Sequence, residues 1–362
     1  MPADLGAARS PYQKPLVFDG HNDVLLRLLL DRAAGKPADF FDNGGSGHID
    51  LKRARAGGLI GGLFACFAPP RHTMASFTGA DLTEVARDDF APLPQPEALS
   101  FTMQMIAEAL HIEARSEGAL RICRNSAELE DAITQEQFAI VLHMEGAEAI
   151  DADLAALEVL YAAGLRSLGP VWSRATIFGH GVPMRFGVSP DIGAGLSDAG
   201  RRLVQRCDQL GVLLDVSHLN EKGFWDLASI SERPFVASHS NVHALTPHAR
   251  NLTDKQLHAM AERGCLVGLN YSTRFLSKDG EPEPGLSLER MIQHIDYLLE
   301  ILGEDGVALG SDFDGCQVPD AIGDAAGLPH LIAAMHRAGY GEALIEKIAH
   351  KNWLGLFKRS GF

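Results

Sequence analysis

The chain has 362 residues, of which 46% are hydrophobic and 22% charged, and its formal net charge is −15. This composition is typical of a globular protein with a sizeable core, and the length fits one large domain or two ordinary ones. The acidic balance argues against nucleic acid and against anionic membrane surfaces as partners.

The N-terminal segment and the cysteines indicate the compartment. Residues 1–15 lack the apolar core of a signal peptide, and no later apolar run is long enough to span a bilayer. The five cysteines are scattered, odd in number and without CxxC spacing, which argues against a disulfide framework or a thiolate zinc site. We therefore expect a soluble, cytoplasmic protein with no membrane partner.

Short apolar runs alternate with helical patterns along the chain. The runs expected to form strands are 16–18, 59–67, 138–142, 165–171, 212–216, 235–237, 265–270 and 306–309. Buried strands joined by crossover helices form a parallel sheet, and eight such units predict an α/β fold of the (β/α)8 TIM-barrel type. An open doubly wound sheet is the alternative, but it usually carries GxGxxG after its first strand, where this chain has DGHND. With no linker in the sequence, we expect a single domain over residues 1–362.

Helices are expected between these strands. Their predicted ranges are 24–32, 49–56, 99–116, 153–163, 197–211 and 253–263, with further helices after Asn220, from Ser287, and near Trp353 and Phe357. Ser197 and Asn220 are predicted N-caps, because their side chains can accept a hydrogen bond from the first helical turn. Two long segments rich in Pro or Gly, about 68–97 and 172–196, are expected to be loops, and long loops in compact domains are usually functional or disordered.

Residues that commonly bind metals follow the ends of several predicted strands. They are His21 and Asp23 after the first strand, Glu145 after the third, His218 after the fifth, His239 after the sixth and Asp312 after the eighth. Each alone is more often a scaffold residue than a ligand. In a barrel, however, the carboxyl ends of all strands meet at one face, so these side chains should share one cavity.

The size of this set indicates the type of metal centre. A catalytic zinc ion needs about three protein ligands, so five ligands with one bridging carboxylate fit two ions. Two ions can share one water and convert it to hydroxide at neutral pH. Asp312 is then left to orient or deprotonate that water.

Five segments match one family in sequence order: DGHND, HMEG, LLDVSH, ASHSN and GSDFDG. The chain resembles the membrane (renal) dipeptidase family of zinc peptidases, within the amidohydrolase-like barrels. The resemblance implies a metallo-dipeptidase that hydrolyses small dipeptides, including L-Xaa-D-Xaa, by a hydroxide that bridges two zinc ions. A homodimer, as in the family, is compatible with some apolar surface on the helices.

The resemblance also implies a role for each site residue. His21 and Asp23 would bind one Zn²⁺, His218 and His239 the other, and Glu145 together with a hydroxide would bridge them. Asp312 would be the catalytic carboxylate and would hold the substrate amine, while Arg250 would grip the substrate carboxylate. A guanidinium suits that contact because it is always charged and can bind in a bidentate manner.

One position departs from the family pattern. The family often has a histidine after the fourth strand, whereas this chain has Trp172 there, which offers only an N–H donor and an apolar surface. His180 could fill the gap, although an uninvolved loop histidine is the simpler interpretation. The departure keeps two alternatives open: an amidohydrolase acting on a lactam, lactone or other small amide, and a metal-binding or interaction protein without catalysis.

Overall fold

The computed structural model describes residues 16–42, 44, 46–73 and 90–362. Its parallel strands belong to two hydrogen-bonded sheets, one in the order β1-β2-β4-β5-β6 and one in the order β7-β8-β9. The strands of this path are β1 (Val17–Asn22), β2 (Leu59–Phe67), β4 (Phe138–Glu145), β5 (Leu165–Gly169), β6 (Leu213–Leu214), β7 (Val236–Ala237), β8 (Leu266–Leu269) and β9 (Val307–Leu309).

Two parallel bridges close these sheets into a ring. Asp215 pairs with Val236 between β6 and β7, and Asn22 pairs with Phe313 between β1 and the segment after β9. A further short strand, β3 (Leu120–Ile122), lies off the path and pairs with the first half of β4. The predicted (β/α)8 barrel is thus confirmed, and its strand order follows the sequence.

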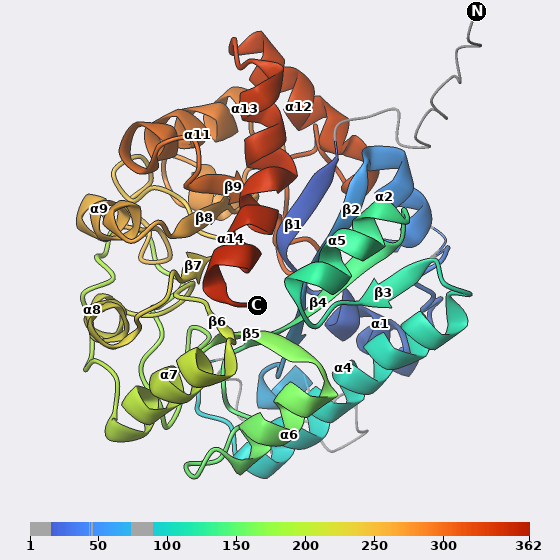
Figure 1. Ribbon diagram of the computed structural model, residues 1–362. Helices are drawn as coiled ribbons and strands as arrows, with labels where there is room; N and C mark the ends of the chain where they lie inside the picture. Colours follow the sequence, from blue (N-terminus) through green and yellow to red (C-terminus); the bar gives the residue numbers. More distant parts are fainter. Residues whose placement is uncertain (1–15, 43, 45, 74–89) are drawn as a thin grey trace, which may run out of the picture.

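The helices surround the ring (Figure 1). They are α1 (Val24–Ala33), α2 (Leu51–Gly57), α4 (Gln95–Arg115), α5 (Ser126–Thr134), α6 (Ala155–Ala163), α7 (Asp198–Leu210), α8 (Glu221–Ile230), α9 (Asp254–Glu262), α10 (Thr273–Leu276), α11 (Leu288–Leu302), α12 (Leu328–Arg337), α13 (Glu342–Glu346) and α14 (Asn352–Ser360). A 3₁₀ turn (Ala325–Gly327) precedes α12, and a π turn (Lys347–Lys351) precedes α14.

Local sequence explains where several helices begin. The side chain of Ser197 accepts a hydrogen bond from the Gly200 amide, and the side chain of Asn220 accepts one from Gly223, so both predicted N-caps are confirmed. Helix α4 begins at Gln95, earlier than expected, because Pro96 stands in its first turn, where proline is tolerated.

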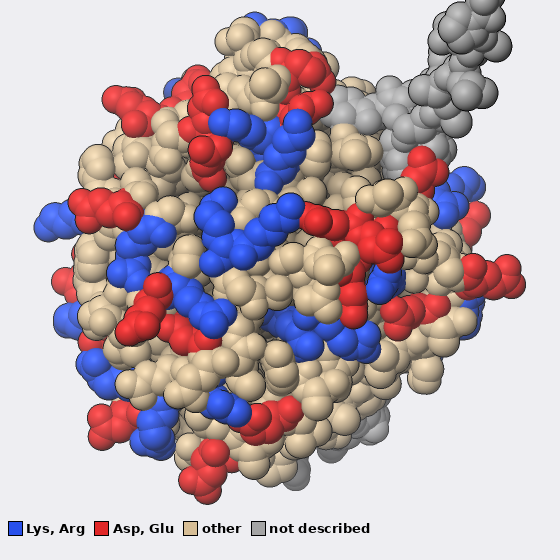
Figure 2. Space-filling model, viewed as in Figure 1, with Lys and Arg blue, Asp and Glu red and all other residues tan. Residues whose placement is uncertain are grey.

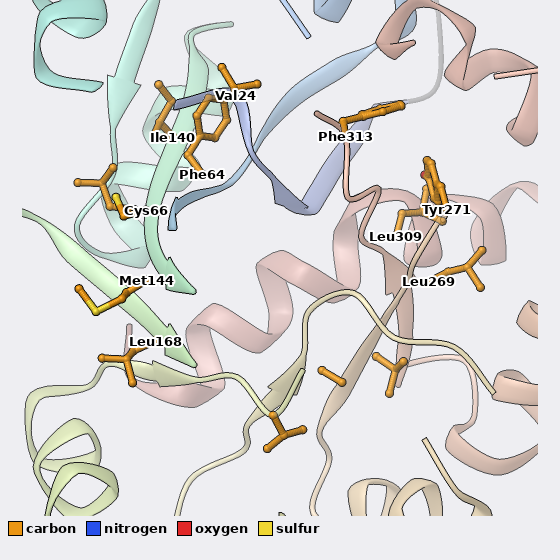
Figure 3. Close-up of a cluster of buried hydrophobic side chains, with 14 of the residues drawn as sticks. Val24, Phe64, Cys66, Ile140, Met144, Leu168, Leu269, Tyr271, Leu309 and Phe313 are labelled. Carbon is orange, nitrogen blue, oxygen red and sulfur yellow. The ribbon is translucent and has the colours of Figure 1, made fainter. Parts of the chain in front are cut away.

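The core has two layers, because successive side chains of each strand point to opposite sides of the barrel wall. Side chains such as Phe64, Ile140 and Met144 point outward and pack under the helices (Figure 3). The inward layer includes Phe18 and is closed by Trp353 and Phe357 of α14. Figure 1 shows α14 lying across the middle of the ring, and because Phe18 stands near the start of β1, this is the amino-terminal end of the barrel. The carboxyl ends of the strands remain for the site.

Some predictions of structure are incomplete or untested. Strand β3 and helices α5 and α12 were not expected from the sequence. Residues 1–15, where no signal peptide is expected, and 74–89 of the predicted loop 68–97 lie outside the described part of the chain. Within that part, no helix is long and apolar enough to cross a membrane. A single domain over residues 1–362 and a cytoplasmic location stay predictions.

The face of the barrel covered by α14 carries charges of both signs. Figure 2 shows lysine and arginine side chains interspersed with aspartate and glutamate there, with neither sign dominating. The residues predicted to bind metal lie at the opposite end of the barrel, where the carboxyl ends of the strands meet.

Candidate metal centre

A cavity of about 210 Å³ opens at the carboxyl ends of the strands. Four of the predicted site residues line it: Asp23, Glu145, His218 and Asp312. His21 and His239 lie directly beneath, and their ring nitrogens belong to the same clusters of potential ligand atoms. All six predicted residues are therefore brought together, although they come from the first and last strands and from strands between.

Strand geometry explains why these side chains point inward. On β4, Ala139 and Val141 face the barrel interior, so the alternation also turns His143 and Glu145 inward. Strand β1 has a register shift between Asp19 and Asn22. This irregularity interrupts the alternation that begins with inward-facing Phe18, and His21 reaches the site.

Glu145 lies at the centre of the cluster, with a different histidine set near each oxygen. Its Oε2 is 3.6 Å from His21 Nε2. Its Oε1 is 2.9 Å from His218 Nε2 and 3.5 Å from His239 Nε2. The Asp23 carboxylate completes the first side, with Oδ2 at 3.6 Å from His21 Nε2. The arrangement is that of a bridging carboxylate between two ligand sets.

The polar atoms of the site fit metal ions. Both ring nitrogens of His21 and the Oδ1 atom of Asp23 are buried without a hydrogen-bond partner among the described residues. Unpaired buried polar atoms are costly, so such atoms usually have a ligand or a water. Imidazole and carboxylate groups are the ligands that zinc and similar divalent ions prefer.

Electrostatics also favour a cation. Burial and the adjacent carboxylates Asp23 and Asp312 raise the pKa of Glu145. Burial lowers the pKa of His218 and His239 well below the usual value, so both imidazoles are neutral and free to bind a metal. Although burial opposes this, Glu145 and Asp23 raise the pKa of His21 well above its usual value, so the buried carboxylates already attract positive charge, which a divalent ion could supply.

Two of the site residues have unusual backbone conformations. His218 has φ of 70° and Asp312 has φ of 58°, both in the left-handed region that non-glycine residues rarely adopt. Hydrogen bonds hold these turns: Val182 donates its amide to the carbonyl of His218 at 2.8 Å, and Asp312 donates its amide to the carbonyl of His21 at 3.0 Å. Strained backbone held in this way is typical of functional sites.

A second layer of polar groups supports the histidines. The Oγ atom of Ser238 lies 2.8 Å from His239 Nδ1 and donates to Asp215 Oδ2 at 2.5 Å. The Oγ atom of Ser173 lies 2.8 Å from His218 Nδ1. Sequence analysis did not assign these roles. Asp215 stands in the LLDVSH segment, three residues before His218 at the end of the same strand, and this position was the available signal.

Arg250 lies beside the cavity without lining it. It is buried, and its guanidinium donates to Ser240 Oγ at 3.2 Å and to the carbonyl of His239 at 2.9 Å. The same group lies 5.5 Å from the ring centre of Phe275, which does line the cavity. Arg250 is thus placed behind the His239 ligand, and its Nε atom has no partner within the described residues.

Of the two residues of the predicted loop 172–196 that were considered for the site, Trp172 and His180, one lines the cavity. Trp172 lines the cavity, and its ring centre is 5.8 Å from that of His218. His180 is half-buried and is not among the lining residues. The lining also includes Phe67, Met184 and Cys316, which sequence analysis did not assign to the site.

Gly315 gives a first testable prediction. A Cβ atom at this position would lie 2.2 Å from Asp23 Oδ2 and 2.6 Å from Asp312 Oδ1. Gly315→Ala should therefore displace both carboxylates and reduce bound metal and kcat/KM by at least about tenfold, as for other changes that disturb ligand geometry. The matched control is Gly341→Ala, where no atom lies within 4 Å of the added Cβ. Metal content and rates equal to those of the wild type would contradict this.

Comparison with known proteins agrees with this geometry. The profile of the family described as membrane dipeptidase, peptidase family M19, matches residues 7–360. An uncharacterised protein from the pqqA 5′ region of Klebsiella pneumoniae is 44% identical over 262 residues, which cover 72% of this chain and 97% of that protein.

Two solved structures are similar over nearly their whole length. One, described as a dipeptidase of the M19 metallopeptidase family, has a TM-score of 0.88 and 45% identity, covering 96% of this chain and 99% of its own. The other is a metallopeptidase from Rhodobacter sphaeroides with a bound phosphinate mimic of the dipeptide L-Ala-D-Ala. It has a TM-score of 0.87 and 46% identity, covering 95% of this chain and 99% of its own.

Proposed function

This chain belongs to the membrane dipeptidase family, peptidase family M19, a family of metallo-dipeptidases and hence of hydrolases, and we propose that it hydrolyses small dipeptides with two bridged zinc ions. The observation that carries the two-ion proposal is the position of Glu145. One of its oxygens faces His21, and the other faces His218 and His239.

The proposed ligand sets follow from these distances. His21 and Asp23 would hold one ion, His218 and His239 would hold the second, and Glu145 would offer a carboxylate oxygen to each. When bound, two such ions supply a water that is nucleophilic at neutral pH and an electrophile for the scissile carbonyl. The buried carboxylates of Asp23, Glu145 and Asp312 would supply the negative charge that attracts the ions.

Asp312 is the proposed proton carrier. Its carboxylate lines the cavity, and Asn270 Nδ2 donates to its Oδ2 at 2.9 Å, which fixes its orientation. Burial raises the pKa of Asp312, an effect that Asp23 also increases. A carboxyl group with a raised pKa is better suited to accept a proton from the attacking water and to pass it to the leaving amine.

The ends of the substrate are charged, and the site offers a partner for each. We assign the substrate ammonium to Asp312 and, as the family resemblance implies, the substrate carboxylate to Arg250. Arg250 lies behind Phe275 and His239, and its unpartnered Nε is the atom left for that contact. The mimic of L-Ala-D-Ala bound by the similar Rhodobacter protein supports a dipeptide with a D-residue at its carboxyl end as one substrate of this chain.

A dipeptide screen tests the proposed function. Zinc-loaded protein should hydrolyse members of a panel of L-Xaa-L-Xaa and L-Xaa-D-Xaa dipeptides, and elemental analysis should find two ions per chain. Chelation should abolish the hydrolysis. Metal loading without cleavage of any dipeptide would overturn the proposal.

Asp312→Asn separates the role of Asp312 from metal binding. The amide cannot accept the proton, so kcat should fall by about 10²–10⁴-fold, the usual contribution of general acid–base catalysis. The metal content should stay at the wild-type value, because Asp312 is not a proposed ligand. Wild-type turnover in this variant would refute the assigned role.

A second candidate function shares the site. Trp172 on the cavity wall, where an imidazole could have served a dipeptide, favours a lactam, lactone or other small amide as substrate. Cyclic amides in the same panel distinguish the two candidates. Faster hydrolysis of a cyclic amide than of every dipeptide would favour the second.

A further inference from the structure

Trp172 forms part of the cavity wall, and its position bears on which dipeptides can fit in the cavity. We propose that Trp172 is a specificity-determining residue that limits the substrate to dipeptides with small side chains, an inference that rests on the proposed function. Ligand cavities for drug-sized molecules measure about 300–1,000 Å³. The cavity here is about 210 Å³, and metal ions with their water would occupy part of it.

The position of Trp172 makes it the element that narrows this space. It follows β5, and its ring centre lies 5.2 Å from that of Phe67 at the end of β2 and 5.8 Å from that of His218. The indole therefore spans the gap between a strand end and a proposed zinc ligand. A substrate side chain that extends in this direction must stop at the ring.

Trp172 is also held firmly. The guanidinium of Arg174 lies 5.1 Å from the Trp172 ring centre and 5.4 Å from that of Phe67, so one cation contacts both aromatic walls. Arg174 is itself fully buried; its Nε donates to Glu148 Oε1 at 2.6 Å, and it also donates to the carbonyl of Ala68.

The backbone next to the indole is equally constrained. A Cβ atom on Gly181 would lie 1.8 Å from the Trp172 carbonyl oxygen, so the loop packs directly on this residue. Rotation of the indole away from a bulky substrate would break the contacts with Arg174 and Phe67 inside a close-packed interior. The wall thus acts as a fixed limit on size.

The test compares three dipeptides: L-Ala-L-Ala, L-Ala-L-Phe and L-Phe-L-Ala. Wild-type protein should cleave L-Ala-L-Ala with at least about tenfold higher kcat/KM than one or both of the bulky dipeptides, the discrimination expected from steric exclusion in a pocket. Trp172→Ala should reduce this ratio about tenfold, mainly through a lower KM for the bulky substrate, and Trp172→Phe should be intermediate.

Two controls keep the result specific. Trp225→Ala removes an exposed tryptophan from α8 and should leave the ratio unchanged. Zinc content should stay at the wild-type value in both Trp172 variants, which shows that His218 is undisturbed. If the wild type cleaves all three dipeptides equally, or if Trp172→Ala keeps the ratio, this inference fails while the proposed function stands. If no dipeptide is cleaved, both fail.

Discussion

Glu145→Gln is expected to lose at least one of the two ions and to reduce kcat/KM by about a thousandfold. A carboxylate offers an acceptor oxygen to each ligand set, whereas an amide offers one oxygen and one N–H donor. The donor would face either His21 or the pair His218 and His239, and the negative charge shared by both ion positions would be gone. Loss of a preorganised charge at the reacting centre has effects of about this size.

The measurement is elemental analysis of the purified variant beside kcat/KM on the best dipeptide of the panel. Glu158→Gln is the matched control, because Glu158 is a glutamate that pairs with Arg206 at the surface instead of facing the histidines. Two tightly bound ions in Glu145→Gln would exclude the bridging role.

Asp215→Asn is expected to weaken metal binding by about 10–100-fold, the usual effect of removing the partner of a metal-binding histidine. Asp215 can only accept hydrogen bonds, so Ser238 donates its hydroxyl proton to Asp215 and accepts from His239 Nδ1. This leaves the Nε2 atom of His239 unprotonated and directed at the site. Asparagine can donate to Ser238 instead, which removes that constraint on His239.

Competition with a chelator measures this affinity directly, and the weaker ion should be the one assigned to His218 and His239. Asp305→Asn is the matched control on the surface, where the carboxylate contacts only Lys347 among described residues. Ser238→Ala breaks the same chain of hydrogen bonds without changing a charge and should give a similar loss. Unchanged affinity in both Asp215 and Ser238 variants would rule out the proposed orientation of His239.

The barrel was predictable from sequence because its strands are short, apolar on both faces and separated by helical patterns. The glycines of β2 permit the close approach of neighbouring strands: a Cβ on Gly61 would lie 2.2 Å from the Ala139 carbonyl of β4. Strand β3 was missed because its three residues include the half-exposed Arg121 and give no periodic signal.

The candidate site was predictable to the level of its convergent side chains, since each lies in the last residues of a strand or soon after it. Its supporting contacts were not, because they join segments whose proximity depends on the closed ring. Ser173 beside His218 and Arg174 beside Phe67 are examples. The size of the cavity likewise depends on how Trp172 and Met184 of the segment after β5 pack against Phe275 of α10.

The contact between Asn22 and Phe313 has a consequence for the order of events during synthesis. Strand β1 pairs with β2, which follows it closely in the chain, but its neighbour on the other side, at Phe313, is synthesised only after the other strands of the ring. Such long-range closure is slow, because loop entropy is lost before the contact forms. All five proposed ligands precede Phe313 in the chain, but they would not be held together until the ring closes. Cations that bind only the closed ring would then stabilise the finished protein by mass action.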